Sequence, residues 1–355
     1  MAFELEQYLS DEFERLIRDA MRLSSRNPKQ RAFFRRFAAS AKKAAARRHD
    51  FEQVGEHIPS FLIASITDAC NLKCAGCYSQ SNQSPVSSGE MTIGDWKRIF
   101  AEAGELGISA VLLAGGEPLL RRDVFETAAE SKNILFPVFT NGTMFDDGAL
   151  RLFDAYRNLV PIISIEGGET ETDARRGSGV FKKATEAMRR LSELNVPFGV
   201  SVTVTSANLN GVTSAAFAGE VERMGAGALI FVEYVPVCQP FLALGDEERA
   251  LLADAVSALR AEKPRIIVIS FPGDEAKSEG CLAAGRGFFH ISASGGAEPC
   301  PFSPYSDLNL KSGTIREALK SPLFTRLKQE GLLTAKHNGG CVLFEHEITV
   351  ASLVK

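Results

Sequence analysis

The sequence has no apolar run that approaches the roughly 18–20 residues of a membrane-spanning helix. Its glycines and prolines follow no repeat, which excludes a collagen-like or low-complexity chain. Positive charge is not in excess, because the formal net charge is −4, and this argues against nucleic acid as the partner of the whole molecule. The charged N-terminal segment is not typical of a signal peptide. What remains is a 355-residue chain, 45% apolar and 24% charged, as expected of one large globular domain or two modest ones.

Cysteine is scarce and odd in number, with seven residues at positions 70, 74, 77, 238, 281, 300 and 341. An odd count in a large chain argues against a disulfide framework. Three of the cysteines fall within eight residues, which is too tight for ordinary structural thiols. We therefore expect metal or redox chemistry in a reducing cytoplasm.

Most of the chain alternates strand-length apolar runs with helical patterns. Six such runs are expected to be strands, over 61–66, 108–114, 134–140, 159–166, 196–204 and 228–235. Their nearly continuous apolar character is typical of strands buried on both faces, and so of a parallel sheet with helices outside. Right-handed crossovers would curl this α/β unit into a partial (β/α)6 TIM-like barrel.

The sequence predicts four segments. Residues 1–57 form a helical N-terminal extension, 58–245 the (β/α)6 core, 246–280 a connecting helix and strand, and 281–345 a small Cys-rich module with a hairpin. Between Arg26 and Arg48 there are nine basic residues and no acidic ones. This stretch is either the solvated face of a helix packed on the core or a surface for anionic lipid, nucleic acid or an acidic partner.

Cys70, Cys74 and Cys77 directly follow the first expected strand. In a β/α barrel this is the end of the sheet at which chemistry takes place. Structural zinc usually has four protein ligands. Three thiolates on a four-iron cluster leave one iron open to a substrate or cofactor.

The CxxxCxxC pattern in this position resembles the radical S-adenosylmethionine (SAM) superfamily, over roughly residues 60–345. The resemblance implies a [4Fe-4S] cluster on Cys70, Cys74 and Cys77, whose open iron binds SAM. In the family an aromatic residue often precedes the third cysteine, whereas here Gly76 holds that position and Tyr78 follows. The residues that the resemblance assigns to SAM lie at successive strand ends: Gly115, Gly116, Glu117, Pro118, Thr140, Asn141, Ser164, Glu166 and Arg176, with Tyr78.

The tail pattern Cys281-x13-Gly295-x4-Cys300 resembles the opening of the SPASM auxiliary-cluster domain. The CxxC-containing knot that would follow is missing and only Cys341 remains, so the resemblance is to the shorter, Twitch-like version. It implies a second, auxiliary [4Fe-4S] cluster on Cys281, Cys300 and Cys341. The candidates for its fourth ligand are Cys238, His346, His337, a water or the substrate, and zinc is the competing metal.

The resemblance implies an enzyme that cleaves SAM reductively to a 5′-deoxyadenosyl radical, which takes hydrogen from a substrate carbon. It needs an external one-electron reductant of flavodoxin or ferredoxin type. The substrate would be a peptide or a small metabolite. The segment 1–57 is too short for a winged-helix peptide-binding domain. A decarboxylase or dehydrogenase of a tetrapyrrole or other cofactor precursor is therefore an alternative to a peptide maturase. A non-catalytic iron–sulfur carrier or sensor is a second alternative.

Overall fold

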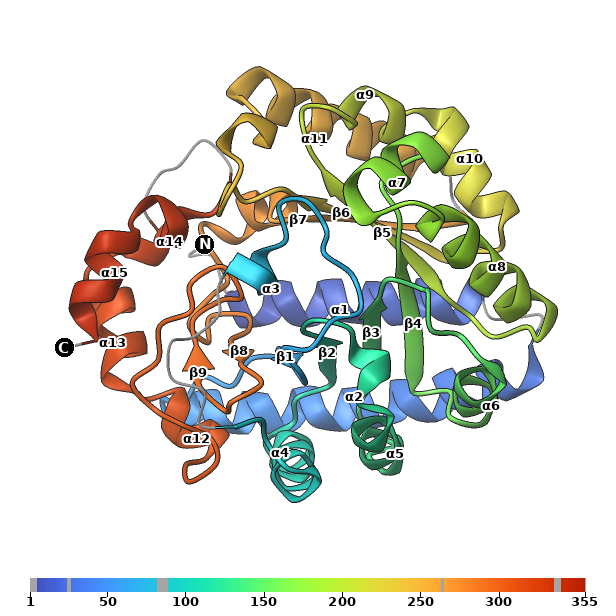
Figure 1. Cartoon of the computed structure of the whole chain (residues 1–355). Helices are drawn as coiled ribbons and strands as arrows, with labels where there is room; N and C mark the ends of the chain where they lie inside the picture. Colours follow the sequence, from blue (N-terminus) through green and yellow to red (C-terminus); the bar gives the residue numbers. More distant parts are fainter. Residues whose placement is uncertain (1–4, 24–26, 82–88, 263–264, 335–339, 355) are drawn as a thin grey trace.

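A computed structural model describes residues 5–23, 27–81, 89–262, 265–334 and 340–354 (Figure 1). Its centre is one nine-stranded sheet in the order β7-β6-β5-β4-β3-β2-β1-β8-β9, in which every pairing except β8 with β9 is parallel. The sheet is open, with β7 and β9 at its edges. The strands are β1 Phe61–Ser65, β2 Ala110–Ala114, β3 Phe136–Thr140, β4 Leu159–Ser164, β5 Gly199–Val204, β6 Ala228–Glu233, β7 Ile267–Phe271, β8 His290–Ile291 and β9 Ala297–Glu298.

Most of the helices between the strands lie on the outside of the curved sheet (Figure 1). α4 shows what fixes the ends of such a helix: Thr92 and Asp95 make a reciprocal capping box, and Gly107 ends the helix in the left-handed conformation. The helices of this part are α3 Tyr78–Ser81, α4 Ile93–Leu106, α5 Arg122–Glu130, α6 Asp147–Ala155, α7 Glu169–Arg176, α8 Val180–Glu193, α9 Leu209–Val212, α10 Ala215–Arg223 and α11 Asp246–Glu262, with the short 3-10 turns η2 Pro118–Leu120 and η3 Pro240–Leu242.

The six expected strands all form, and a seventh joins them. β7, which we expected only as a connector, pairs in parallel with β6 from Ala228↔Ile267 to Val232↔Phe271. α11 supplies the crossover for this pairing, so β6-α11-β7 is one further β/α unit of the barrel.

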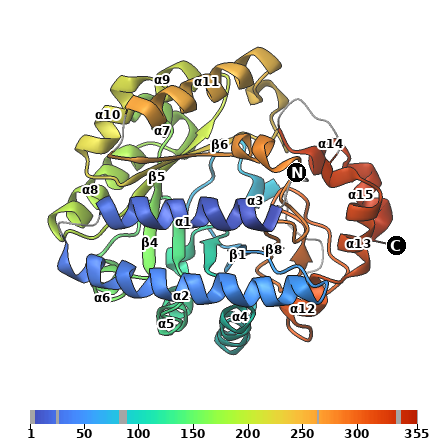
Figure 2. The same ribbon diagram turned by 180° about the vertical axis from the view of Figure 1, so that it is seen from behind.

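Two long helices, α1 Leu5–Leu23 and α2 Pro28–Gln53, lie side by side across the sheet, as seen most clearly from behind (Figure 2). Phe33, Phe34 and Phe37 form a small apolar cluster of their own, against which Leu135 just before β3 packs. Arg47 donates to the carbonyls of Gly104 and Glu105 at the end of α4. These contacts place the helices at the amino ends of the strands, opposite the end that carries the cysteines.

The tail is continuous with the barrel sheet. β8 pairs in parallel with β1, and β9 turns back on β8 through Gly295, whose φ is +92°. Phe288 stacks on Phe61 of β1 and also meets Phe271 of β7 edge-on. Its ring therefore lies between β1 and β7, which do not pair with each other. The remaining elements are η4 Gly273–Ser278, α12 Ile315–Ala318, α13 Pro322–Gln329, η5 Leu332–Thr334, α14 Val342–Glu345 and α15 Glu347–Leu353.

Within the described residues, none of the helices has the length and apolar character needed to cross a membrane.

Candidate functional site

The cysteine triplet lies on the loop between β1 and α3, at the carboxyl end of the sheet. All three thiols are partly exposed and in no disulfide. Burial raises the pKa of Cys70 and of Cys74, and for Cys74 the nearby Arg176 and Arg175 act in the opposite direction. A bound metal would reverse this preference, because metal ligation stabilises the thiolate.

Gly115 and Gly116 are required by the backbone of the cysteine loop. A Cβ on Gly115 would lie 2.3 Å from the Thr67 carbonyl oxygen, and one on Gly116 would lie 2.2 Å from that of Ala69. Gly116 N–H donates to Thr67 O at 2.8 Å, and Glu117 N–H donates to Ala69 O at 2.9 Å. The two glycines therefore let the end of β2 lie directly against the chain that leads to Cys70.

Glu117 is fully buried, and its carboxylate bonds within the protein. It accepts hydrogen bonds from Leu119 N at 3.0 Å, Thr140 Oγ1 at 2.7 Å and Asn141 N at 2.8 Å. Burial raises its pKa, and these three donors work against that rise. Glu117 thus joins the end of β2 to the end of β3, with Pro118 beside it starting η2.

Asn141 extends this connection to the cysteine loop. Its Nδ2 donates to Asn71 Oδ1 at 2.9 Å, and Asn71 Nδ2 donates to Thr143 Oγ1 at 2.8 Å. Asn71 lies directly after Cys70 and is exposed. The sequence gives no signal for Asn71, because the motif fixes only the cysteines around it.

At the next strand, Glu166 is 1% exposed and accepts from Arg175 at 2.6 Å, from Arg176 Nε at 2.7 Å and from Thr203 N at 3.0 Å. Ser164 exchanges a hydrogen bond with Ser201. The Arg175 carbonyl accepts from Ala75 N at 2.8 Å, which brings both arginines beside the cysteine loop. The Nε of Arg175 is buried without a hydrogen-bond partner. This N–H group of Arg175 is therefore free to donate to an anionic ligand bound beside the three cysteines.

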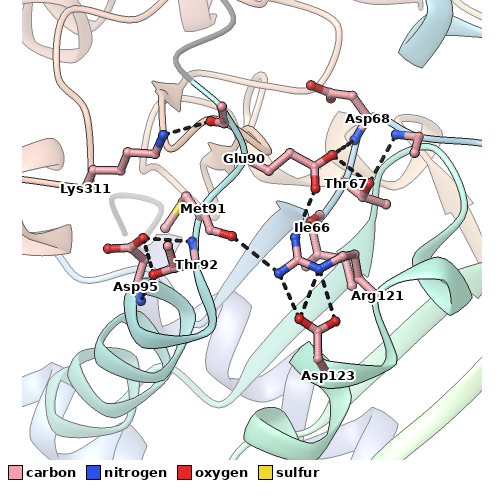
Figure 3. A network of polar contacts seen from close by, with 12 residues as sticks. Ile66, Thr67, Asp68, Glu90, Met91, Thr92, Asp95, Arg121, Asp123 and Lys311 are labelled. Carbon is pink, nitrogen blue, oxygen red and sulfur yellow. Dashed lines mark hydrogen bonds and ion pairs between the residues drawn. The ribbon is translucent and has the colours of Figure 1, made fainter.

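A network of ion pairs fixes the start of the same loop (Figure 3). Glu90 accepts from Thr67 Oγ1 at 2.7 Å and from Asp68 N at 2.9 Å. Arg121 pairs with Glu90 at 3.0 Å and with Asp123 at 3.0 Å. The network therefore ties the segment before α4, the end of β1 and the start of α5 together just ahead of Cys70.

The aromatic residues around the triplet are not where the motif alone suggested. The Tyr234 ring, just after β6, fills the space above Gly76, so that a Cβ at Gly76 would lie 2.7 Å from it. Tyr78 points instead to the tail, where its ring meets Phe302 edge-on with centroids 5.1 Å apart. Tyr78 directly follows Cys77, and burial raises the pKa of its phenol well above the ordinary range, with Cys77 and Cys300 acting in the same direction.

The tail brings its three cysteines together, although they are far apart in sequence. Cys281, Cys300 and Cys341 line one small cavity with Glu275 of η4 and Phe302. Burial raises the pKa of Cys281 and of Cys300, whereas the thiol of Cys300 donates to Cys341 and lowers the pKa of Cys341. No motif in the sequence pointed to Glu275, which is 6% exposed.

Two of the residues considered as a fourth ligand lie elsewhere. Cys238 is exposed, and its sulfur is 3.8 Å from the Tyr234 hydroxyl. His346 is exposed at the start of α15. His337 lies outside the described residues.

A buried hydrogen-bond chain runs between the barrel and the tail. His290 of β8 lies 2.8 Å from Ser65 Oγ of β1 and 2.7 Å from Glu298 of β9. In the sequence His290 has no spacing partner that would point to a functional site. The structure gives it two polar partners from different strands.

Each of the two groups supplies three thiols, the donor type that holds iron–sulfur clusters. In the part of the chain that the structure describes, no three His, Cys, Asp or Glu side chains are arranged to hold a single metal ion.

Comparison with known proteins agrees with this geometry. Residues 64–222 match the sequence model of the Radical SAM superfamily. The chain is 27% identical over 306 residues to an AdoMet-dependent heme synthase of Methanosarcina barkeri, which covers 78% of this chain and 87% of that protein. It is 29% identical over 187 residues to the sporulation killing factor maturation protein SkfB of Bacillus subtilis, covering 52% of this chain and 44% of that one.

A solved structure shows the same fold. Streptococcus suis SuiB bound to its precursor peptide SuiA superimposes with a TM-score of 0.66 at 16% identity, over 86% of this chain and 76% of that one. Residues 64–222 therefore form a domain of the radical SAM superfamily, whose enzymes cleave SAM reductively at a [4Fe-4S] cluster.

Proposed function

We propose that this enzyme holds two clusters, one on Cys70, Cys74 and Cys77 and an auxiliary [4Fe-4S] cluster on Cys281, Cys300 and Cys341. The observation that carries the proposal is the position of Tyr78, which directly follows Cys77 and whose ring packs edge-on against Phe302, a residue that lines the cavity of the three tail cysteines. One side chain thus connects the loop of the first three thiols to the cavity of the other three. When bound, the first cluster with SAM supplies a radical that abstracts hydrogen, and the second accepts an electron or binds substrate.

In this proposal, residues at the strand ends support the cysteine loop and orient the side chains that bind SAM. Glu117, Thr140 and Asn141 hold the ends of β2 and β3 against the cysteine loop. Glu166 orients Arg175 and Arg176 toward it. In this proposal Ser164 and Arg176 face the ligand, while Glu117 and Glu166 are positioning residues. Tyr234 replaces the aromatic ring that Gly76 cannot provide.

The first cluster needs an electron from outside the chain, for which a flavodoxin or ferredoxin is the proposed donor. Low-potential iron–sulfur sites of this kind call for a reducing compartment, so we place the enzyme in the cytoplasm.

For the substrate, the matched lengths favour a tetrapyrrole or related cofactor precursor. The heme synthase is matched over 87% of its length, whereas SkfB is matched over 44%. Radical abstraction beside a side-chain carboxylate, with the auxiliary cluster as electron acceptor, would give oxidative decarboxylation. A peptide substrate is the second candidate, supported by the fold shared with SuiB.

Anaerobic reconstitution tests the proposal. We expect about eight irons and no zinc per chain, and release of 5′-deoxyadenosine with SAM and dithionite. The Cys281→Ala/Cys300→Ala/Cys341→Ala variant should keep about four irons and still cleave SAM, but should form no product from a tetrapyrrole that carries side-chain carboxylates. About four irons with one zinc in the wild type would refute the second cluster. An intact first cluster without SAM cleavage would point to an electron carrier or sensor.

A further inference from the structure

Glu275 stands out among the buried acids of the described residues. Its side chain is 6% exposed and lines the same cavity as Cys281, Cys300 and Cys341. The carboxyl group accepts hydrogen bonds from the Cys281 thiol and from the backbone of Leu282. Its Oε1 has no hydrogen-bond partner. A buried, unpartnered carboxyl oxygen is rare in folded proteins and calls for an explanation.

The place of this oxygen in the cavity points to a ligand. The thiols of Cys281, Cys300 and Cys341 would account for three of the four irons of a cubane cluster. The Glu275 carboxyl group is the further donor in the same cavity, and its Oε1 is buried with no hydrogen-bond partner. A buried polar oxygen is costly to leave unpartnered, and a bound cation would remove that cost.

We propose that Glu275 is the fourth protein ligand of the auxiliary cluster, bound to its non-cysteine iron through a carboxylate oxygen. This inference rests on the two-cluster function proposed above. The element that carries Glu275 is suited to the role. η4 follows β7 directly, at the carboxyl edge of the sheet, and Glu275 N–H donates to Pro272 O at 2.7 Å. The short turn fixes the backbone, so the carboxyl group is already in place.

This assignment makes the auxiliary cluster unlike the first one. Iron is ligated by oxygen as well as sulfur, and a hard oxygen donor makes that iron distinct from its three neighbours. Two alternatives without a Glu275 ligand predict different spectra. A water ligand would not depend on residue 275, and a protonated Glu275 that only donates a hydrogen bond would leave the four irons nearly alike.

The test uses the full chain carrying Cys70→Ala, Cys74→Ala and Cys77→Ala, so that all iron reports on the tail. This parent is reconstituted anaerobically with ⁵⁷Fe and compared with E275Q and E275A in the same background. E279Q is the matched control, because Glu279 is an exposed acid on the same segment. The readouts are iron content, Mössbauer spectra, and the electron paramagnetic resonance (EPR) signal of three-iron clusters after mild oxidation.

For the parent and E279Q we expect about one quarter of the Mössbauer area at a larger isomer shift. In E275Q and E275A that component should disappear, and the three-iron signal should increase several-fold. Four proteins with the same spectra would overturn the Glu275 ligand while leaving the auxiliary cluster intact. A parent with no four-iron signal would instead overturn the two-cluster function, and Glu275 ligation with it.

Discussion

Replacing Glu117 by Ala should unfold the metal-free protein at clearly lower urea concentration. The substitution leaves three buried donors without their acceptor: Leu119 N, Thr140 Oγ1 and Asn141 N. Each unsatisfied buried donor costs about 1–3 kcal/mol, so the sum is about 3–9 kcal/mol. Part of this is offset because the variant no longer buries a carboxylate whose pKa burial raises. We therefore expect a loss of about 3–5 kcal/mol, a large share of the about 5–15 kcal/mol typical of a folded domain.

The assay is urea denaturation under anaerobic, metal-free conditions, followed by far-ultraviolet circular dichroism. T140V removes one donor and leaves the carboxylate with two, so it should cost about 1–2 kcal/mol. E126Q changes an exposed acid on α5 and should stay within about 0.5 kcal/mol of the wild type. If E117A is within about 1 kcal/mol of the wild type but loses SAM binding, Glu117 contacts the ligand and the positioning role is refuted.

Three further predictions concern other regions. C77A should lose about four irons and release no 5′-deoxyadenosine. C238A changes an exposed thiol and should keep the iron content and the 5′-deoxyadenosine release of the wild type. If C77A cleaves SAM at the native rate, the triplet is not the catalytic site. Hydrogen bonds from Arg316 and Lys320 lower the pKa of Glu56 to about 2, so its contribution to stability is full above pH 4.5 and is lost as pH falls toward 2. The melting temperature of E56Q should thus be lower than that of the wild type at pH 7, with the gap closing near pH 2; a constant gap would contradict the linkage. The basic helix α2 should bind anionic vesicles negligibly at physiological salt, where the Debye length is about 8 Å, and strong sedimentation with vesicles there would identify a membrane surface.

The strands and the main helices could be predicted because their signals are local. An apolar run such as 228–235 is read from neighbouring residues, and the Thr92 capping box from residues three apart. The role of Glu117 could not be predicted in this way. Its position in a Gly-Gly-Glu-Pro stretch predicts a ligand contact, whereas its hydrogen bonds to Thr140 and Asn141 join it to the end of the next strand and leave no local signal.

Residues whose role depends on distant partners gave no signal at all. Gly76 lacks a side chain because Tyr234 occupies that space, and the two are 158 positions apart. Glu275 is one acid among 44 Asp and Glu residues, and only folding brings it to the three tail cysteines. The role of such residues depends on contacts that form only in the folded protein. The sequence therefore reveals the cysteines of a candidate metal site more readily than the other side chains that line it.

The way in which the tail joins the barrel has a consequence for how the two cysteine groups cooperate. β1 ends in the first cysteine loop, and the same strand pairs with β8 through Ile63↔His290 and Ala64↔Ile291. Backbone register, rather than a linker, therefore sets the position of the tail relative to Cys70. The buried bonds of His290 to Ser65 and Glu298 reinforce that register. A substrate held between the groups would thus meet both at fixed positions, which is what hydrogen abstraction at one site and electron transfer to the other require.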